Sequence, residues 1–163
     1  MRAVPRYRID LTDPARCRLG FRTGDGAIGP MLSELSRHLH GLGVGRELVE
    51  DGMIALAEIL NNVEEHAYAG QAGGCVHVEL AADDGALRCA VEDLGAPMPG
   101  GSLPSGTMPA SDPAAPESWP EGGFGWAMVR RLVHDIRYVR TEDRNRLCFT
   151  ISPASAPRRG TPG

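Results

Sequence analysis

The sequence predicts an α/β two-layer sandwich, with one mixed, mostly antiparallel sheet covered on one face by helices. Three observations predict it. Strand-like alternation appears near the start of the chain, in its middle and near its end, and two neighbouring segments carry apolar residues at helical spacing. Each helical segment has one apolar stripe, as a helix packed on a sheet requires. With 163 residues and 42% hydrophobic residues, the chain is large enough to bury such a core.

The first elements are two short extended segments and a helix. Residues 7–11 alternate weakly and are ended by Thr12-Asp13-Pro14, and residues 17–21 form a second extended segment. Residues 27–42 then carry apolar side chains at helical spacing, and the glycines at the end of this segment predict its stop.

A second, longer helix is expected from about residue 45 to residue 69. Its apolar stripe is formed by Val49, Met53, Leu56, Leu60, Val63 and Ala67. Its other side carries Glu58, Asn61, Asn62, Glu65 and His66. Two adjacent Asn residues are poor helix formers, so a role other than helix stability is expected for them. Glu58 and Asn62 are four residues apart, which places both side chains at one spot on the helix.

The remaining elements follow from turn and spacing signals. Residues 75–81 and 86–91 predict an antiparallel hairpin around Asp83-Asp84-Gly85. Residues 96–121 contain seven of the 13 prolines and fit no regular element, which is typical of a lid, a binding loop or a disordered linker. A helix over residues 122–134 and a hairpin of residues 136–140 and 146–151 complete a single domain over residues 1–152. Residues 153–163 are expected to be a disordered tail.

Composition excludes several classes of function. A net charge of −4 and a pI near 5.7 argue against binding to nucleic acid or to an anionic membrane. All 17 basic residues are Arg, so no P-loop or Schiff-base lysine exists in this chain. The four widely spaced cysteines indicate reduced thiols, and neither a signal peptide nor a transmembrane run is visible. A cytoplasmic protein is expected.

Three motifs could carry chemistry. A carboxylate beside a neutral oxygen ligand, as in Glu58 and Asn62, suits a general base next to Mg²⁺, although an exposed polar helix face would look the same. Asp93 closes a strand and Gly95 follows, which would suit an exocyclic amine and a ring, or an ordinary turn. The glycines of residues 122–126 precede a helix, whose first N–H groups favour an anion; a flexible hinge is the alternative.

The order of these motifs resembles the GHKL ATP-binding superfamily with its Bergerat fold, from about residue 7 to residue 151. Within that superfamily the chain looks most like the SpoIIAB/RsbW-like anti-sigma factor serine kinases. The run Glu58-x-x-x-Asn62-x-x-x-His66-x-Tyr68 is similar to that group's N box. The segments Val129-Arg130-Arg131-Leu132-Val133 and Arg144-Asn145-Arg146-Leu147, with Tyr138 between them, are similar to its C-terminal half.

The resemblance implies a role for each matching residue. Asn62 would coordinate Mg²⁺ on the phosphates of ATP, and Glu58 would be the general base that takes the proton of a substrate hydroxyl. Asp93 would bind the adenine amine with Gly95 against the base, and residues 96–121 would be the lid. The backbone of Gly123, Phe124 and Gly125 would hold the phosphates. The other nucleotide-binding positions implied are His66, Met98, Gly122 and Trp126.

The resemblance also implies a function and partners. The protein would be an ATP-dependent serine-protein kinase that phosphorylates a STAS-domain antagonist and sequesters a sigma factor or similar target in a partner switch. It suggests a homodimer. Three alternatives remain open: a non-catalytic regulator that binds ATP or ADP and sequesters a partner, the catalytic fragment of a histidine kinase, and an interaction domain without nucleotide.

The chain departs from the family pattern at several positions. Ala96-Pro97 follows Gly95 where many relatives have a second x-Gly pair, and Trp126 replaces a smaller apolar residue. Asn145 stands near the place where a Thr often contacts ATP in relatives. Residues 96–121 contain no basic residue, which predicts a weaker clamp on the phosphates.

Overall fold

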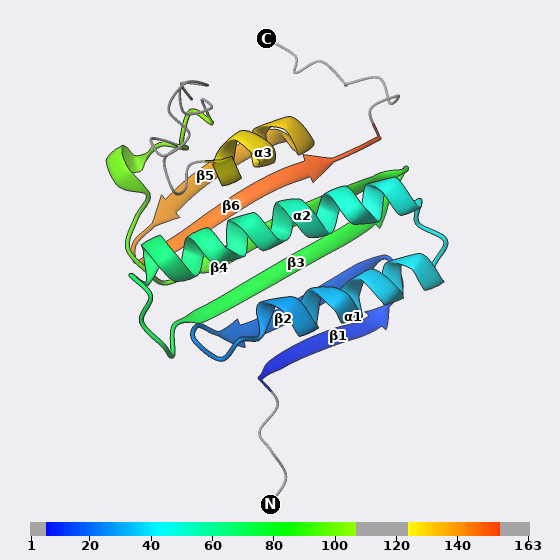
Figure 1. Cartoon of the computed structure of the whole chain (residues 1–163), viewed down its shortest axis with the longest axis horizontal. Helices are drawn as coiled ribbons and strands as arrows, with labels where there is room; N and C mark the ends of the chain where they lie inside the picture. Colours follow the sequence, from blue (N-terminus) through cyan, green and yellow to red (C-terminus); the bar gives the residue numbers. More distant parts are fainter. Residues whose placement is uncertain (1–5, 107–123, 154–163) are drawn as a thin grey trace, which may run out of the picture.

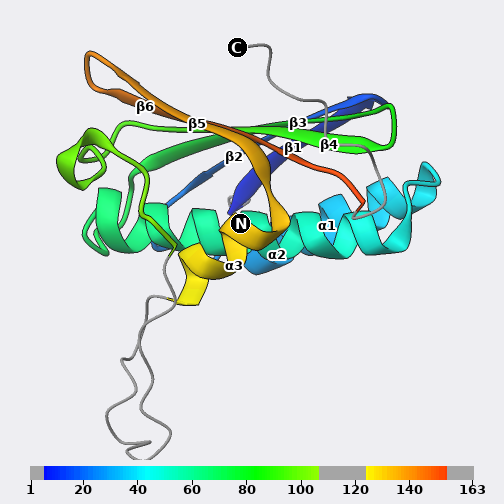
Figure 2. The ribbon, with the colours of Figure 1, turned by 90° about the horizontal axis from the view of Figure 1, so that it is seen from above.

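The structure is a computed structural model that describes residues 6–106 and 124–153. Its described residues form a six-stranded sheet with three α-helices on one face (Figures 1 and 2). The strands are β1 (Tyr7–Asp13), β2 (Arg16–Arg22), β3 (Cys75–Asp83), β4 (Ala86–Asp93), β5 (His134–Thr141) and β6 (Arg144–Ile151). The helices are α1 (Ile28–Gly41), α2 (Arg46–Asn62) and α3 (Phe124–Leu132). The predicted fold class is confirmed.

The sheet has the order β1-β2-β3-β4-β6-β5, and all five pairings are antiparallel. The mixed sheet of the prediction therefore has no parallel pair among the described residues. Two helices, α1 and α2, connect β2 to β3 and return the chain to the same end of the sheet, so these neighbours run in opposite directions. The connection from β4 through α3 leads to β5, but β6 lies between these two strands.

The core lies between the sheet and the helices. Alternation along each strand places one set of side chains under the helices, as in β2, where Cys17, Leu19 and Phe21 are buried between exposed arginines. Of the apolar stripe predicted for the second helix, Val49, Leu56 and Leu60 are fully buried. The other three residues, Met53, Val63 and Ala67, are partly buried. Gly52 brings α2 close to the sheet, since a Cβ at that position would lie 2.8 Å from Leu87 Cδ1.

The long helix is interrupted where the sequence predicted one element to residue 69. α2 ends at Asn62, and residues Val63–Ala67 form a π-helical turn, η1. In η1 the N–H of Tyr68 bonds to the carbonyl of Val63, five residues back. One turn earlier, the Asn62 Nδ2 donates to the backbone carbonyl of Glu58 at 2.6 Å. Tyr68 follows η1, and its hydroxyl donates to the carbonyl of Cys75 at 2.7 Å.

The loop after β4 contains one short regular element that the sequence did not predict. Residues Pro99–Gly101 form a 3₁₀ turn, η2, in which proline fixes the first φ angle and Gly100 has a φ of 66°. Residues 107–123 of the predicted lid and residues 154–163 of the predicted tail lie outside the described residues. None of the described helices is long and apolar enough to cross a membrane.

Candidate functional site

A cavity of about 480 Å³ lies between the C-terminal end of α2, the loop after β4 and strands β5 and β6. Its wall is mostly apolar, with a few polar side chains that could orient a ligand. The lining residues are Ile59, Asn62, Val63, His66, Ala67, Val91, Asp93, Ala96, Pro97, Met98, Pro99, Pro104, Trp126, Tyr138, Asn145 and Leu147. Five of the site residues predicted from the sequence thus meet at one cavity: Asn62, His66, Asp93, Met98 and Trp126.

Asp93 supplies the buried carboxylate of the cavity. It is 7% exposed at the end of β4, and its Oδ1 accepts hydrogen bonds from the Gly95 N–H at 2.8 Å and from Asn145 Nδ2 at 2.7 Å. Burial raises the pKa of Asp93, while these two hydrogen bonds and the nearby Arg140 oppose that shift. Both bonds go to one oxygen, which leaves Oδ2 as the acceptor that Asp93 can offer to a ligand amine.

Asn145 organises the floor of the cavity. It is 4% exposed and lies opposite Asp93 in the register of β4 and β6. Its Nδ2 also donates to the carbonyl of Ala96 at 3.0 Å, and its Oδ1 accepts hydrogen bonds from Tyr138 and Arg140, both at 2.7 Å. The resemblance placed Asn145 near the nucleotide only loosely. A stronger signal was available, because Asn145 is polar at an inward position of a strand that otherwise alternates apolar side chains.

Tyr138 and Arg140 of β5 bind the loop after β4, a contact that was not predicted from the sequence. The Tyr138 hydroxyl accepts a hydrogen bond from the Met98 N–H at 3.1 Å, and Arg140 donates to the carbonyl of Gly95 at 3.0 Å. These two side chains of β5 therefore attach the beginning of the predicted lid to the sheet. They could not be found from spacing, because they depend on the position of β5 beside β6.

The Glu58 and Asn62 side chains lie together next to the first turn of α3. A Cβ built on Gly125 would lie 2.4 Å from Glu58 Oε2 and 3.8 Å from Asn62 Nδ2. The predicted proximity of the Glu58 and Asn62 side chains is therefore confirmed. Any side chain at position 125 would push the Glu58 carboxylate away. Since Asn62 Nδ2 is bonded to the helix backbone, its Oδ1 is the atom suited to bind a cation.

Gly95 is needed for contact between the loop and the end of the long helix. A Cβ at this position would lie 2.5 Å from the carbonyl oxygen of Ala67, which already accepts a 2.7 Å hydrogen bond from the Ala96 N–H. Gly95 therefore has a packing role within the fold, beside the contact with the ligand ring that the resemblance implies. Gly122 and Gly123 lie outside the described residues, and Phe124 is the first residue of α3.

Gly95→Ala is expected to destabilise the protein by roughly 1–3 kcal/mol, because a backbone carbonyl cannot move aside as a side chain can. Chemical denaturation of the purified variant measures this effect. Gly29→Ala is the matched control: Gly29 lies in α1 with open space around its Cβ position, so the change should be neutral or stabilising by up to about 1 kcal/mol. Equal midpoints for Gly95→Ala and the wild type would contradict the packing role.

Comparison with known proteins identifies the family of this chain. Residues 23–151 match the family described as the histidine kinase-like ATPase domain. The chain belongs to this family. ATP is the ligand that membership in the histidine kinase-like ATPase domain family implies.

A solved structure shares the fold of this ATPase domain. It contains the RsbU and RsbW domains of Rv1364c from Mycobacterium tuberculosis, and the similarity has a TM-score of 0.54 at 21% identity. The match covers 83% of the present chain but 31% of the other, so this ATPase domain spans about a third of that protein. At this identity the likeness concerns the fold. A comparison with curated proteins gave no match.

Proposed function

We propose that the protein is an ATP-dependent serine-protein kinase of the anti-sigma type. It phosphorylates a STAS-domain antagonist and sequesters a sigma factor or similar target in a partner switch. The family match and the RsbW-containing neighbour support this proposal. The observation that carries it is the arrangement of the site: a buried Asp93 in an apolar cavity, and the Glu58 carboxylate beside Asn62 and Gly125.

Each residue then has a chemical task. Asp93 accepts a hydrogen bond from the adenine amine through Oδ2, since Oδ1 is already used. Asn62 offers Oδ1 to Mg²⁺, and the ion, when bound, neutralises charge on the phosphates. Glu58 takes the proton of the acceptor hydroxyl. Gly125 leaves the space in which the Glu58 carboxylate lies, and Trp126 and Met98 supply apolar wall.

A second candidate is a regulator that binds ATP or ADP and sequesters a partner without transfer. One observation favours it: residues 96–121 contain no basic side chain, so the predicted lid has no cation to neutralise the charge of a departing phosphoryl group. Both candidates require the nucleotide. They differ in phosphoryl transfer, which occurs and depends on Glu58 only if the protein is a kinase.

Binding of Mg·ATP is the first measurement. Isothermal titration with ATP, with and without magnesium, is expected to show binding that magnesium strengthens. At about 100 times the dissociation constant, the ligand should add roughly 2.7 kcal/mol to the free energy of unfolding. Asn62→Ala should remove most of the magnesium effect. Asn61→Ala, which changes the exposed neighbouring residue, serves as its control. If adenine nucleotides do not bind to the folded protein, both candidate functions are wrong.

A further inference from the structure

The face of the sheet opposite the helices is rich in arginine. No described helix covers it (Figure 2). Residues that alternate with the core side chains point to this face, and every strand except β3 contributes an arginine to it. These arginines are Arg8, Arg16, Arg18, Arg22, Arg88, Arg137, Arg144 and Arg146, against the acidic Asp10, Glu79, Asp83, Glu92 and Asp135. The net charge of the chain is −4, so positive charge is concentrated on one surface of an acidic protein.

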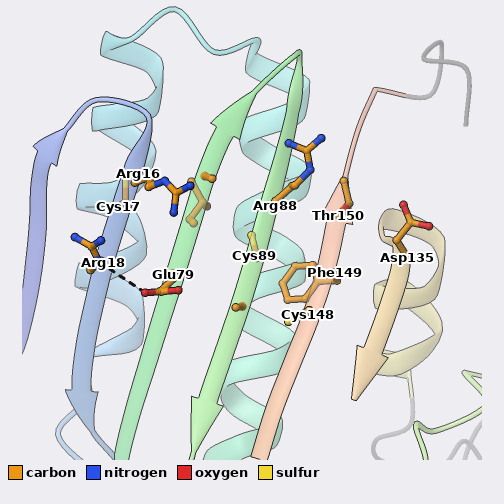
Figure 3. Close-up of a pocket in the computed structure, with 13 residues that line it drawn as sticks. Arg16, Cys17, Arg18, Glu79, Arg88, Cys89, Asp135, Cys148, Phe149 and Thr150 are labelled. Atoms are coloured by element: carbon orange, nitrogen blue, oxygen red, sulfur yellow. Dashed lines mark ion pairs between the residues drawn. The ribbon is translucent and has the colours of Figure 1, made fainter. Parts of the chain in front are cut away.

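This face is hollowed over β2, β3, β4 and β6. We call the hollow the outer-face pocket; it has a volume of about 270 Å³ and is bordered by Arg16, Arg18 and Arg88 (Figure 3). Arg16, Ala81 and Arg88 are direct cross-strand neighbours, so about 10 Å separate the two arginine Cα atoms. The short side chain of Ala81 leaves the space between them. Ala90 continues the small, apolar floor in the next row.

Two arginines around the outer-face pocket form ion pairs that a ligand carboxylate can replace. Arg18 pairs with Glu79 at 3.7 Å, with side chains 60% and 59% exposed, and Arg88 pairs with the half-exposed Asp83. Exposed pairs of this kind contribute little stability, so a ligand carboxylate can replace them at low cost. Arg16 is exposed and has no ion pair within the described parts of the chain. A ligand carboxylate can therefore bind its guanidinium without displacing another carboxylate.

We infer that the outer-face pocket binds an acidic segment of a partner protein, with a carboxylate held between Arg16 and Arg88. Guanidinium groups bind carboxylates through paired hydrogen bonds, and the apolar floor accommodates the methylene groups of Asp or Glu. Carboxylates spaced along a peptide fit better than a continuous phosphate backbone. Glu79 and Asp135 also edge the pocket, so a ligand whose charge repeats without a gap is repelled there, whereas a ligand with separate carboxylates can place them at the arginines alone.

This inference goes beyond the proposed function and does not depend on it. The cavity lined by Asn62 and Asp93 lies on the helix side of the sheet, and the outer-face pocket lies on the other side.

Fluorescence anisotropy with a labelled peptide of four alternating glutamate and serine pairs tests the inference on the full chain. The peptide should bind at low ionic strength and more weakly at about 0.15 M salt, where the Debye length falls to about 8 Å. The double variant Arg16→Gln/Arg88→Gln should weaken binding by about tenfold or more. Ala81→Glu should do the same, because it places a competing carboxylate between the two arginines. Glu58→Gln should leave peptide binding unchanged.

The control is Arg37→Gln/Arg46→Gln, which removes the same charge from exposed positions on α1 and α2. Melting curves of all variants establish that they fold. Three results would overturn the inference: no binding of the peptide, equal loss in the control, or tighter binding of a single-stranded oligonucleotide of equal charge. Dimerisation of the chain through this face, abolished by Arg16→Gln/Arg88→Gln, would also overturn it.

Discussion

Glu58→Gln is expected to reduce phosphoryl transfer by about 10²- to 10⁴-fold while the affinity for Mg·ATP stays the same. The amide keeps the size of the side chain beside Gly125 but cannot accept a proton at neutral pH. Transfer is measured with ATP labelled at the γ-phosphate and a STAS-domain protein from the same genome, and affinity is measured by titration calorimetry. The reason is the position of the carboxylate, which lies next to Asn62 and the first turn of α3.

Glu47→Gln is the matched control, because Glu47 is an exposed acid at the other end of the same helix. It should leave both transfer and affinity unchanged. A wild-type rate in Glu58→Gln would remove Glu58 from the reaction. A wild-type protein that binds ATP but transfers nothing to any STAS-domain protein tested would favour the non-catalytic regulator.

Asp93→Asn is expected to weaken nucleotide binding by about 10- to 100-fold, the loss of one hydrogen bond to a charged group. The Asn oxygen can still accept the bonds from Gly95 and Asn145, so the loop should keep its conformation. The new amide N–H₂ would then face the adenine amine, and two donors cannot bond to each other. Titration calorimetry measures the loss, and ATP bound with wild-type affinity would show that Asp93 does not recognise the base.

The same variant should be more stable than the wild type without ligand. Burial raises the pKa of Asp93, so the folded state takes up its proton more readily than the unfolded state. The ionised carboxylate therefore destabilises the fold at pH 7, and this cost is lost as the pH falls through the raised pKa toward the ordinary aspartate range. Melting temperatures of Asp93→Asn and of the wild type, taken at pH 7 and at about pH 4, check this expectation. The amount by which the variant melts above the wild type should shrink on acidification. An advantage that grows would contradict the sign of the shift.

The sequence predicted most of the fold because its signals were local. Alternation gave β3 and β4, helical spacing gave α1 and α2, and the four-residue step placed Glu58 beside Asn62. The π-helical turn was missed because the apolar spacing continues through it, from Leu60 to Val63 and Ala67, as it would in an unbroken α-helix.

The rest of the candidate site depends on contacts between distant parts of the chain. Tyr138 and Arg140 attach the loop after β4 to β5, and this requires that β6 be inserted between β4 and β5. Likewise, the close approach of the Ala67 carbonyl leaves no room for a Cβ at Gly95, in addition to the local bond of Gly95 to Asp93. Strand order and the approach of a helix end to a loop are properties of the folded chain, and one sequence does not encode them in a readable spacing.

Glu92 and Asp93 are neighbours in β4 that project to opposite sides of the sheet. Glu92 accepts hydrogen bonds from Arg144 and Arg146 on the arginine-rich side, whereas Asp93 is buried in the cavity. A molecule that competes for those two arginines thus acts on the residue directly before the cavity carboxylate. Thermodynamic linkage then requires reciprocity: whatever such a molecule does to the affinity of the cavity for its ligand, that ligand does in equal measure to the affinity for the molecule.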